Sequence, residues 1–230
     1  MTALKQVASQ AIEKSKAAGT RLEARRIAFM NAAQTAFLEK GYGATTLGDI
    51  IAISGGSRQT LYALFGGKQG LFEAIVAERN ADIFRPLLAD GLLDRAPEDV
   101  LVEIGIRFLQ MVLAPDALGL FRLVVAEGPA MRELSERFWA LGPARTITAF
   151  ETYFVEQTRR GVFYLPDVKM AARQFQGMLL GNFHLQCMLN VREIPPSEEI
   201  ESFVKTAVHQ FLNGCGFAGI EPGGAPGGPF

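Results

Sequence analysis

Two glycine pairs, Gly55-Gly56 and Gly66-Gly67, flank a run of polar and apolar side chains in the segment ISGGSRQTLYALFGGKQG (53–70). Glycine-rich turns can bind phosphate through backbone N–H groups, and Lys68 follows the second pair as it would in such a loop. A nucleotide-binding loop also needs Ser or Thr after the lysine and a strand before its first glycine. Here Gln69 follows the lysine, and residues 61–65 have a helical pattern. The sequence therefore does not predict a nucleotide-phosphate site.

The same segment fits two short helices joined by a tight turn. Ser57 is a plausible N-cap for a helix from 58 to about 64, and the first glycine pair separates it from a helix at 47–53. A short glycine-containing turn between two helices is typical of a helix-turn-helix. Arg and Gln side chains near the start of the second helix can form paired hydrogen bonds with guanine and adenine, and hydroxyl or ammonium groups can bind phosphate.

We predict DNA contacts from seven residues: Thr46, Ser57, Arg58, Gln59, Thr60, Tyr62 and Lys68. Spacing alone leaves an ordinary polar surface turn open as the alternative.

Other residue types capable of chemistry are few. His184 and Cys187 lie three positions apart, but no further Cys or His cluster completes a metal site, so a buried histidine and a packing cysteine are the simpler interpretation. The chain has two histidines and no nucleophile–histidine motif. We expect no enzyme activity, no metal and no cofactor.

The elements that must position these residues are helices. Apolar residues recur at three- and four-residue spacing, and alternating strand-like runs are absent. We expect an all-α fold with an N-terminal three-helix DNA-binding domain containing a helix-turn-helix, followed by a C-terminal helical bundle. The helices are predicted at 21–40, 47–53, 58–64, from 68 onward, 97–114, 116–127, 130–141, 143–161, 167–191 and 197–213.

Composition agrees with a folded protein of 230 residues, since 49% of them are apolar and 20% charged. Residues 1–80 hold ten Lys or Arg against six Asp or Glu, whereas the remainder holds thirteen against eighteen. A basic front end favours a polyanionic partner there. The N-terminus lacks the apolar core of a secretory signal, and the uncharged stretch between Arg173 and Arg192 is too polar to span a membrane. We expect a cytoplasmic location.

Residues 29–72 resemble the DNA-binding domain of the TetR family of bacterial transcriptional regulators. The resemblance is carried without a gap by Ala32-Ala33, Phe37, Gly41-Tyr42, Thr45-Thr46, Asp49-Ile50, Gly55, Ser57, Thr60-Leu61-Tyr62, Phe65, Lys68 and Leu71-Phe72. It implies double-stranded operator DNA as a partner.

The segment departs from the family pattern at four positions. Ile51 and Ser54 replace alanine, Gly56 replaces a core-facing valine, and Leu64 replaces an aromatic residue or histidine. Loss of the valine contact would cost about 1–2 kcal/mol of burial and predicts a looser turn. Gly56 and Leu64 also keep open a rival interpretation, a helical ligand-binding protein that has lost specific DNA binding.

Residues 121–150 resemble the C-terminal domain of an AefR-like TetR subgroup, which implies ligand binding and dimerisation. Aromatic residues suggest an apolar pocket with a few polar groups; the candidates are Phe108, Met111, Phe121, Arg122, Glu127, Trp139, Phe150, Tyr153, Phe154 and Phe175. Many of these could instead be ordinary core.

Two amphipathic helices from each of two subunits could form a four-helix dimer interface. The candidate residues are Phe175, Met178, Asn182, Leu185, Leu189, Ile200, Phe203, Val204, Ala207 and Phe211. Alternatively, these apolar stripes face only the subunit's own core.

We therefore predict a flexible basic arm at 1–20, a DNA-binding domain at 21–67, a ligand-binding and dimerisation domain at 68–213, and a flexible Gly/Pro tail at 214–230. The predicted function is a sequence-specific, homodimeric transcriptional regulator, a repressor released from its operator by an unidentified small apolar or amphipathic effector.

Overall fold

The computed structural model describes the backbone of residues 2–84 and 91–214, and the side chains of residues 20–79 and 91–214. Its described residues form helices and no strand, as the all-α prediction requires. The expected tail at 214–230 lies almost entirely outside this part of the chain.

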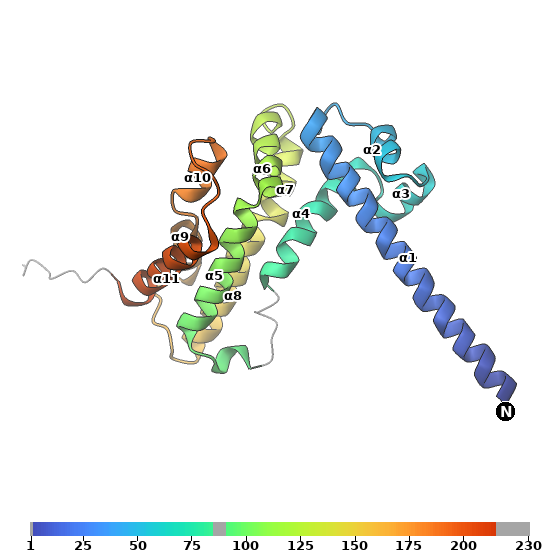
Figure 1. Ribbon diagram of the computed structural model, residues 1–230. Coiled ribbons are helices and arrows are strands. Elements are labelled where there is room, and N and C mark those ends of the chain that lie inside the picture. Colours follow the sequence, from blue (N-terminus) through green and yellow to red (C-terminus); the bar gives the residue numbers. More distant parts are fainter. Residues whose placement is uncertain (1, 85–90, 215–230) are drawn as a thin grey trace, which may run out of the picture.

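Four helices form the N-terminal part: α1 (Thr2–Lys40), α2 (Leu47–Ser54), α3 (Arg58–Phe65) and α4 (Lys68–Phe84). The first helix was predicted to begin near Arg21, whereas α1 begins at Thr2. The flexible basic arm at 1–20 stays a prediction. Figure 1 shows α1 extending well past α2 and α3, which lie together against its other half. The remaining boundaries in this part agree with the sequence to within one or two residues.

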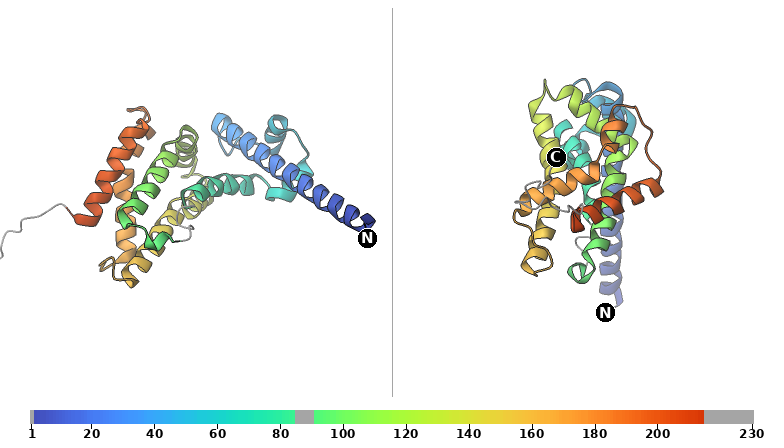
Figure 2. Two further views of the ribbon diagram at one scale, coloured as in Figure 1. Left: turned by 60° about the horizontal axis from the view of Figure 1, so that its bottom comes forward. Right: turned by 90° about the vertical axis from the view of Figure 1, so that its left-hand side faces the viewer.

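The C-terminal part begins with a short 3-10 helix, η2 (Leu92–Asp94). Seven α-helices follow it: α5 (Pro97–Leu113), α6 (Pro115–Glu127), α7 (Arg132–Leu141), α8 (Pro143–Arg159), α9 (Val168–Leu180), α10 (Phe183–Met188) and α11 (Ser197–Asn213). Proline opens α5, α6 and α8, where its missing N–H would have no partner in any case. Figure 2 shows that α4 lies between the C-terminal bundle and the α1–α3 group.

The predicted helix at 167–191 is broken in the structure. Gly181 has a φ of +48° and ends α9, and a Cβ atom there would lie 2.5 Å from Cζ of Phe203 in α11. The phenyl ring can approach the backbone only because residue 181 has no side chain. The break therefore follows from a contact with a helix that comes later in the chain.

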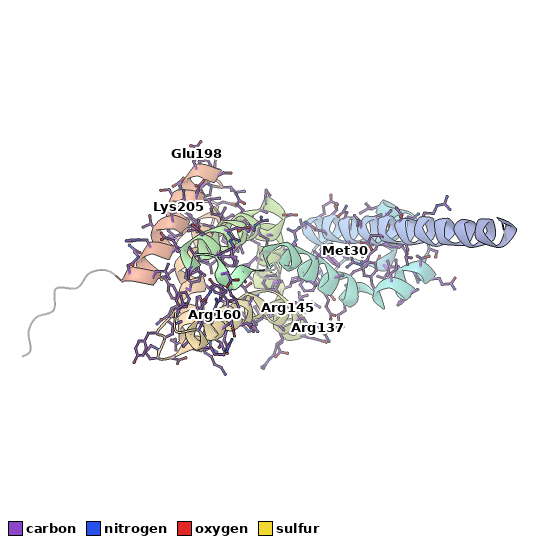
Figure 3. All side chains as sticks on the ribbon, turned by 90° about the horizontal axis from the view of Figure 1, so that it is seen from below. Met30, Arg137, Arg145, Arg160, Glu198 and Lys205 are labelled. Atoms are coloured by element: carbon purple, nitrogen blue, oxygen red, sulfur yellow. The ribbon has the colours of Figure 1, made fainter. Side chains whose placement is uncertain are left out.

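Two hydrophobic clusters hold the molecule together. One contains buried residues of α1–α4 together with Leu120 and Val124 of α6 and Leu134 of α7. The other contains buried residues of α5, α6 and α8–α11. Because α6 and α7 contribute to the first cluster, the C-terminal bundle is packed directly onto the N-terminal helices. In Figure 3, Met30 marks this N-terminal core, and Arg137 and Arg145 lie on α7 and α8 of the bundle.

Among the described residues, no single helix has the length and apolar character to cross a membrane; α5 and α6 meet that test only when taken together across a 63° bend.

Candidate functional site

The start of α2 is fixed by a capping box at Thr46. The Thr46 hydroxyl accepts a hydrogen bond from the Asp49 backbone N–H, and the Asp49 carboxylate accepts one from the Thr46 N–H at 2.8 Å. The ammonium of Lys40, 2.5 Å from Asp49, and the bonds from Thr46 hold the pKa of Asp49 far below its usual value. Thr46 is exposed beside the loop that leads into the helix-turn-helix.

The turn between α2 and α3 is glycine-dependent at Gly56. Its φ is +92°, and a Cβ atom there would lie 3.0 Å from the ring of Phe29 in α1. The guanidinium of Arg25 lies near the same ring and donates a hydrogen bond to the Ser54 carbonyl at 3.2 Å. Glycine here thus permits a left-handed turn tight against α1, where Arg25 holds it.

Helix α3 presents the side chains that the sequence predicts as DNA contacts. Ser57 caps it, accepting a hydrogen bond from the Thr60 N–H at 3.0 Å, while Leu61 is fully buried and fixes the helix face. Arg58, Gln59 and Tyr62 are exposed, and Tyr62 retains 51% of its accessible surface. The first turn of α3 therefore offers a guanidinium and a carboxamide to a partner, as a recognition helix does.

Lys68 has a different environment from the one predicted. Its ammonium donates to the carbonyls of Tyr42, Gly43 and Thr45 at 2.7, 3.2 and 2.9 Å, and lies 4.6 Å from the Tyr42 ring centre. Burial lowers the pKa of Lys68. The lysine connects the start of α4 to the loop before α2, so a phosphate contact would have to compete with three internal acceptors.

Glu127 connects α6 to the same loop before α2. Its carboxylate accepts hydrogen bonds from the backbone N–H groups of Tyr42 and Gly43, both at 2.7 Å. The prediction that Glu127 lines the effector pocket was wrong, because the side chain points to the N-terminal loop. Lys68 and Glu127 thus hold the same loop from two helices.

A cavity of about 260 Å³ lies in the C-terminal bundle, bounded by side chains of α4 through α10. Four of the predicted pocket residues line this cavity: Phe108, Met111, Phe121 and Trp139. Phe121 makes edge contacts with Phe138 and His184, at centroid distances of 5.6 and 4.8 Å. The walls are mostly apolar, as small-molecule sites usually are.

Five other predicted pocket residues do not line this cavity: Arg122, Phe150, Tyr153, Phe154 and Phe175. The four aromatic residues are buried in the C-terminal core, where they pack on one another. Arg122 lies at a second, more open depression and donates to the carbonyls of Cys187 and Met188, at 2.5 and 3.0 Å. Its role is to hold the end of α10.

The polar lining residues of the cavity are Arg79, Thr146, Gln176 and His184, none of them in the predicted pocket. For Arg79 and His184, the sequence contained features that could have indicated an inward-facing position. Arg79 continues the inward spacing of Phe72, Ile75 and Val76 along α4, where a charged residue is unexpected. His184 is the histidine already noted beside Cys187, and burial lowers its pKa.

The predicted dimer residues divide into three groups. Phe175, Ile200, Val204 and Ala207 are buried within the subunit, so their assignment to an intersubunit surface was wrong. Leu185 and Leu189 retain 59% and 64% of their accessible surface, and Asn182 is also exposed. Met178, Phe203 and Phe211 are partly buried against the core.

His184 and Cys187 do not form a metal site with their neighbours, because the described residues contain no group of three potential ligands. The Cys187 thiol is buried, and burial raises its pKa, opposite to the shift that activates a cysteine.

Comparison with known proteins identifies both parts of the chain. Residues 29–75 match the model for bacterial regulatory proteins of the tetR family, and residues 99–214 match that for the C-terminal domain of AefR-like transcriptional repressors. A search of curated proteins found no match.

Solved structures with the same fold include a protein described as a TetR-family transcriptional regulator from Mesorhizobium loti. It is 27% identical, with a TM-score of 0.70 over 84% of this chain and 96% of that one. The Flavonoid-responsive Regulator FrrA is 25% identical, with a TM-score of 0.66 over 82% and 95%. A TetR regulator from Agrobacterium tumefaciens, 24% identical with a TM-score of 0.64 over 82% and 92%, supports the fold. The chain belongs to the TetR family of transcriptional regulators, with a helix-turn-helix for DNA binding and an AefR-like C-terminal domain.

Proposed function

We propose that this protein is a dimeric repressor that leaves its operator when a small, mostly apolar molecule occupies the cavity bounded by α4–α10. The observation that carries the proposal is the position of α4. Its Val76 and Arg79 line the cavity, while Lys68, at its first residue, binds the loop that precedes α2. A ligand would thus touch the helix that supports the DNA-binding motif.

The DNA-binding half of the proposal is supported by the exposed first turn of α3. Arg58 and Gln59 have the types and positions that read base edges in the major groove, and Ser57, Thr60 and Tyr62 can add phosphate contacts. In a dimer, two such helices would lie about 34–36 Å apart and match a two-fold operator. The exposed Leu185 and Leu189 of the α10 region are candidates for the contact between subunits.

The ligand-binding half is supported by the apolar walls and by the relative FrrA, whose name describes it as flavonoid-responsive. A change in the position of α4 requires that the ligand bind one arrangement of the two domains better than the other; a difference of about 1–3 kcal/mol is sufficient for a useful switch.

The test begins with selection of genomic fragments by the purified protein. Fluorescence anisotropy then measures affinity for the selected duplex with and without a panel of flavonoids and small aromatic ketones. We expect at least one compound to weaken operator binding about 5- to 150-fold. An Ala117→Phe variant, which fills part of the cavity, should bind the same operator and lose this response. Tight binding of a compound at the cavity with unchanged operator affinity would contradict the coupling.

A further inference from the structure

Among the described residues that line the cavity, Arg79 is charged and has unused hydrogen-bonding capacity. Four buried side-chain nitrogen or oxygen atoms lack a partner among the described residues, on Arg79, Gln157, Thr158 and Gln186. Of these residues only Arg79 lines the cavity, and the unpartnered atom is its Nε. A buried donor without an acceptor is costly and is uncommon without a functional reason.

The rest of the Arg79 guanidinium is held in place. Its Nη2 atom donates to the Gln34 side-chain oxygen of α1 at 2.9 Å and pairs with the Asp116 carboxylate of α6. Gln34 also donates to Asp116, at 3.1 Å. With 18% of its side chain exposed, Arg79 is thus fixed at one end, while its Nε has no hydrogen-bond partner among the described residues.

Charge balance limits which kind of acceptor the Nε–H group of Arg79 can bind. Asp116 already neutralises Arg79, and among the described residues no second arginine or lysine lines the cavity. A carboxylate entering these apolar walls would bring a charge without a free counter-ion, which is unfavourable in a poorly solvated site. A neutral oxygen acceptor brings no such charge.

The other polar lining residues limit where a ligand can form hydrogen bonds in the cavity. Gln176 donates to the Pro143 carbonyl at 3.3 Å, and the Thr146 hydroxyl donates to the Gly142 carbonyl at 3.4 Å, so both already have an internal partner. His184 faces Phe121 edge-on and, when neutral, offers one further donor or acceptor. The aromatic surface of Phe121 and Trp139 suits a flat, apolar body.

We propose that Arg79 recognises a neutral carbonyl oxygen on a small aromatic ligand, by donating a hydrogen bond to it from the cavity wall. The proposal rests on the ligand-binding function proposed above and names the chemical class of that ligand. Because the Nε atom is buried, the guanidinium must rotate for Nε to reach an oxygen in the cavity. Because the same group binds Gln34 and Asp116, the ligand's polar contact is continuous with a link between α4, α6 and α1.

Three probes with the same ring test this directly: 2-acetylnaphthalene carries a ketone, 2-ethylnaphthalene lacks the oxygen, and 2-naphthoate carries a charge. Isothermal titration calorimetry on the full-length protein gives the affinities. Fluorescence of Trp139, the single tryptophan of the chain and a lining residue, reports whether binding occurs at the cavity. We expect the ketone to bind about tenfold or more tightly than the other two probes, as a hydrogen bond from a charged donor predicts.

Arg79→Lys keeps a cation beside Asp116 but removes the Nε donor, so it should reduce ketone affinity to the level of the hydrocarbon and leave the hydrocarbon unchanged. Asp116→Asn leaves Arg79 without its counter-ion, so it should increase naphthoate affinity about tenfold. The matched control is Arg107→Lys, an exposed ion pair of α5 away from the cavity, which should alter none of the three affinities.

Equal affinity of the wild-type protein for ketone and hydrocarbon, a preference for naphthoate, or a ketone preference that survives Arg79→Lys would each overturn the proposal. Operator binding is measured on the same samples to separate it from the proposed function. If the probes bind without a preference for the ketone, only the proposed role of Arg79 is contradicted. If the protein prefers the ketone but selects no operator, only the proposed regulatory function is contradicted. Absence of any probe binding counts against both.

Discussion

At the scale of single residues, substitution of Lys68 distinguishes a structural role from a DNA-contacting role. Because its ammonium satisfies three carbonyls, Lys68→Met should lower the free energy of unfolding by about 1–3 kcal/mol. Urea unfolding measures this loss, with Arg132→Met, an exposed ion pair of α7, as the control. An unchanged unfolding midpoint together with weaker binding to all DNA would restore the phosphate-contact prediction.

Gly56 is the second residue with a distinct prediction. The sequence suggested that replacing the usual valine loosens the turn. In the structure, however, the left-handed φ of Gly56 and the nearby Phe29 ring both favour glycine at this position. Gly56→Ala should therefore destabilise the protein by about 1–3 kcal/mol. Gly161→Ala, also at positive φ but with open space around it, controls for backbone strain alone and should cost less. A stabilising Gly56→Ala substitution would show that the turn is loose.

At the scale of helices, Glu127 connects α6 to the loop between α1 and α2. Glu127→Gln places an amide where two N–H groups need acceptors, so only one can be satisfied. Hydrogen exchange should show faster exchange at Tyr42 and Gly43 by about tenfold, corresponding to the loss of one charged hydrogen bond. The exposed Glu136→Gln substitution on α7 should leave these two amides unchanged. Unaltered protection in Glu127→Gln would remove this link from the account.

Asp116 provides a pH-dependent link among α1, α4 and α6. The hydrogen bonds from Arg79 and then Gln34 lower its pKa from 3.8 to about 2. A lowered folded-state pKa stabilises the protein above the unfolded value, and this contribution is lost as the pH falls from about 4 toward 2. Since the carboxyl is 44% exposed, solvent screening limits the contribution to ~1 kcal/mol.

The stability difference between wild type and Asp116→Asn should therefore shrink as the pH falls from 5 to 2.5. Urea unfolding across this range measures it. A difference that stays constant with pH would mean that the carboxylate charge is not involved.

The helices show which features the sequence could predict. The cap at Ser57 acts within a few residues, so the local sequence pattern was sufficient to predict it. The break at Gly181 was missed because it depends on Phe203 of α11. A glycine in an apolar helical run carries too little local information to indicate such a contact.

At the scale of the whole molecule, the cavity was the least predictable feature. The exposed DNA-facing residues lie on one short helix, whereas the cavity is assembled by helices spanning more than a hundred positions of the chain. Aromatic residue type pointed to Phe108, Phe121 and Trp139, which line the cavity. It pointed equally to Phe150, Phe154 and Phe175, which are also aromatic but pack in the core. The spacing of α4 could have indicated that Arg79 points inward, but not its partner Asp116, which lies 37 positions later in the chain.

The central claim is that the first turn of α3 reads DNA sequence, and one measurement tests it most directly. Fluorescence anisotropy compares wild type and Arg58→Ala on the selected operator and on a scrambled duplex, at two salt concentrations. We predict a loss of about 5- to 150-fold on the operator for Arg58→Ala, corresponding to ~1–3 kcal/mol, and a much smaller loss on the scrambled duplex. Equal losses on both duplexes, or no preference of the wild-type protein for the selected site, would contradict the account.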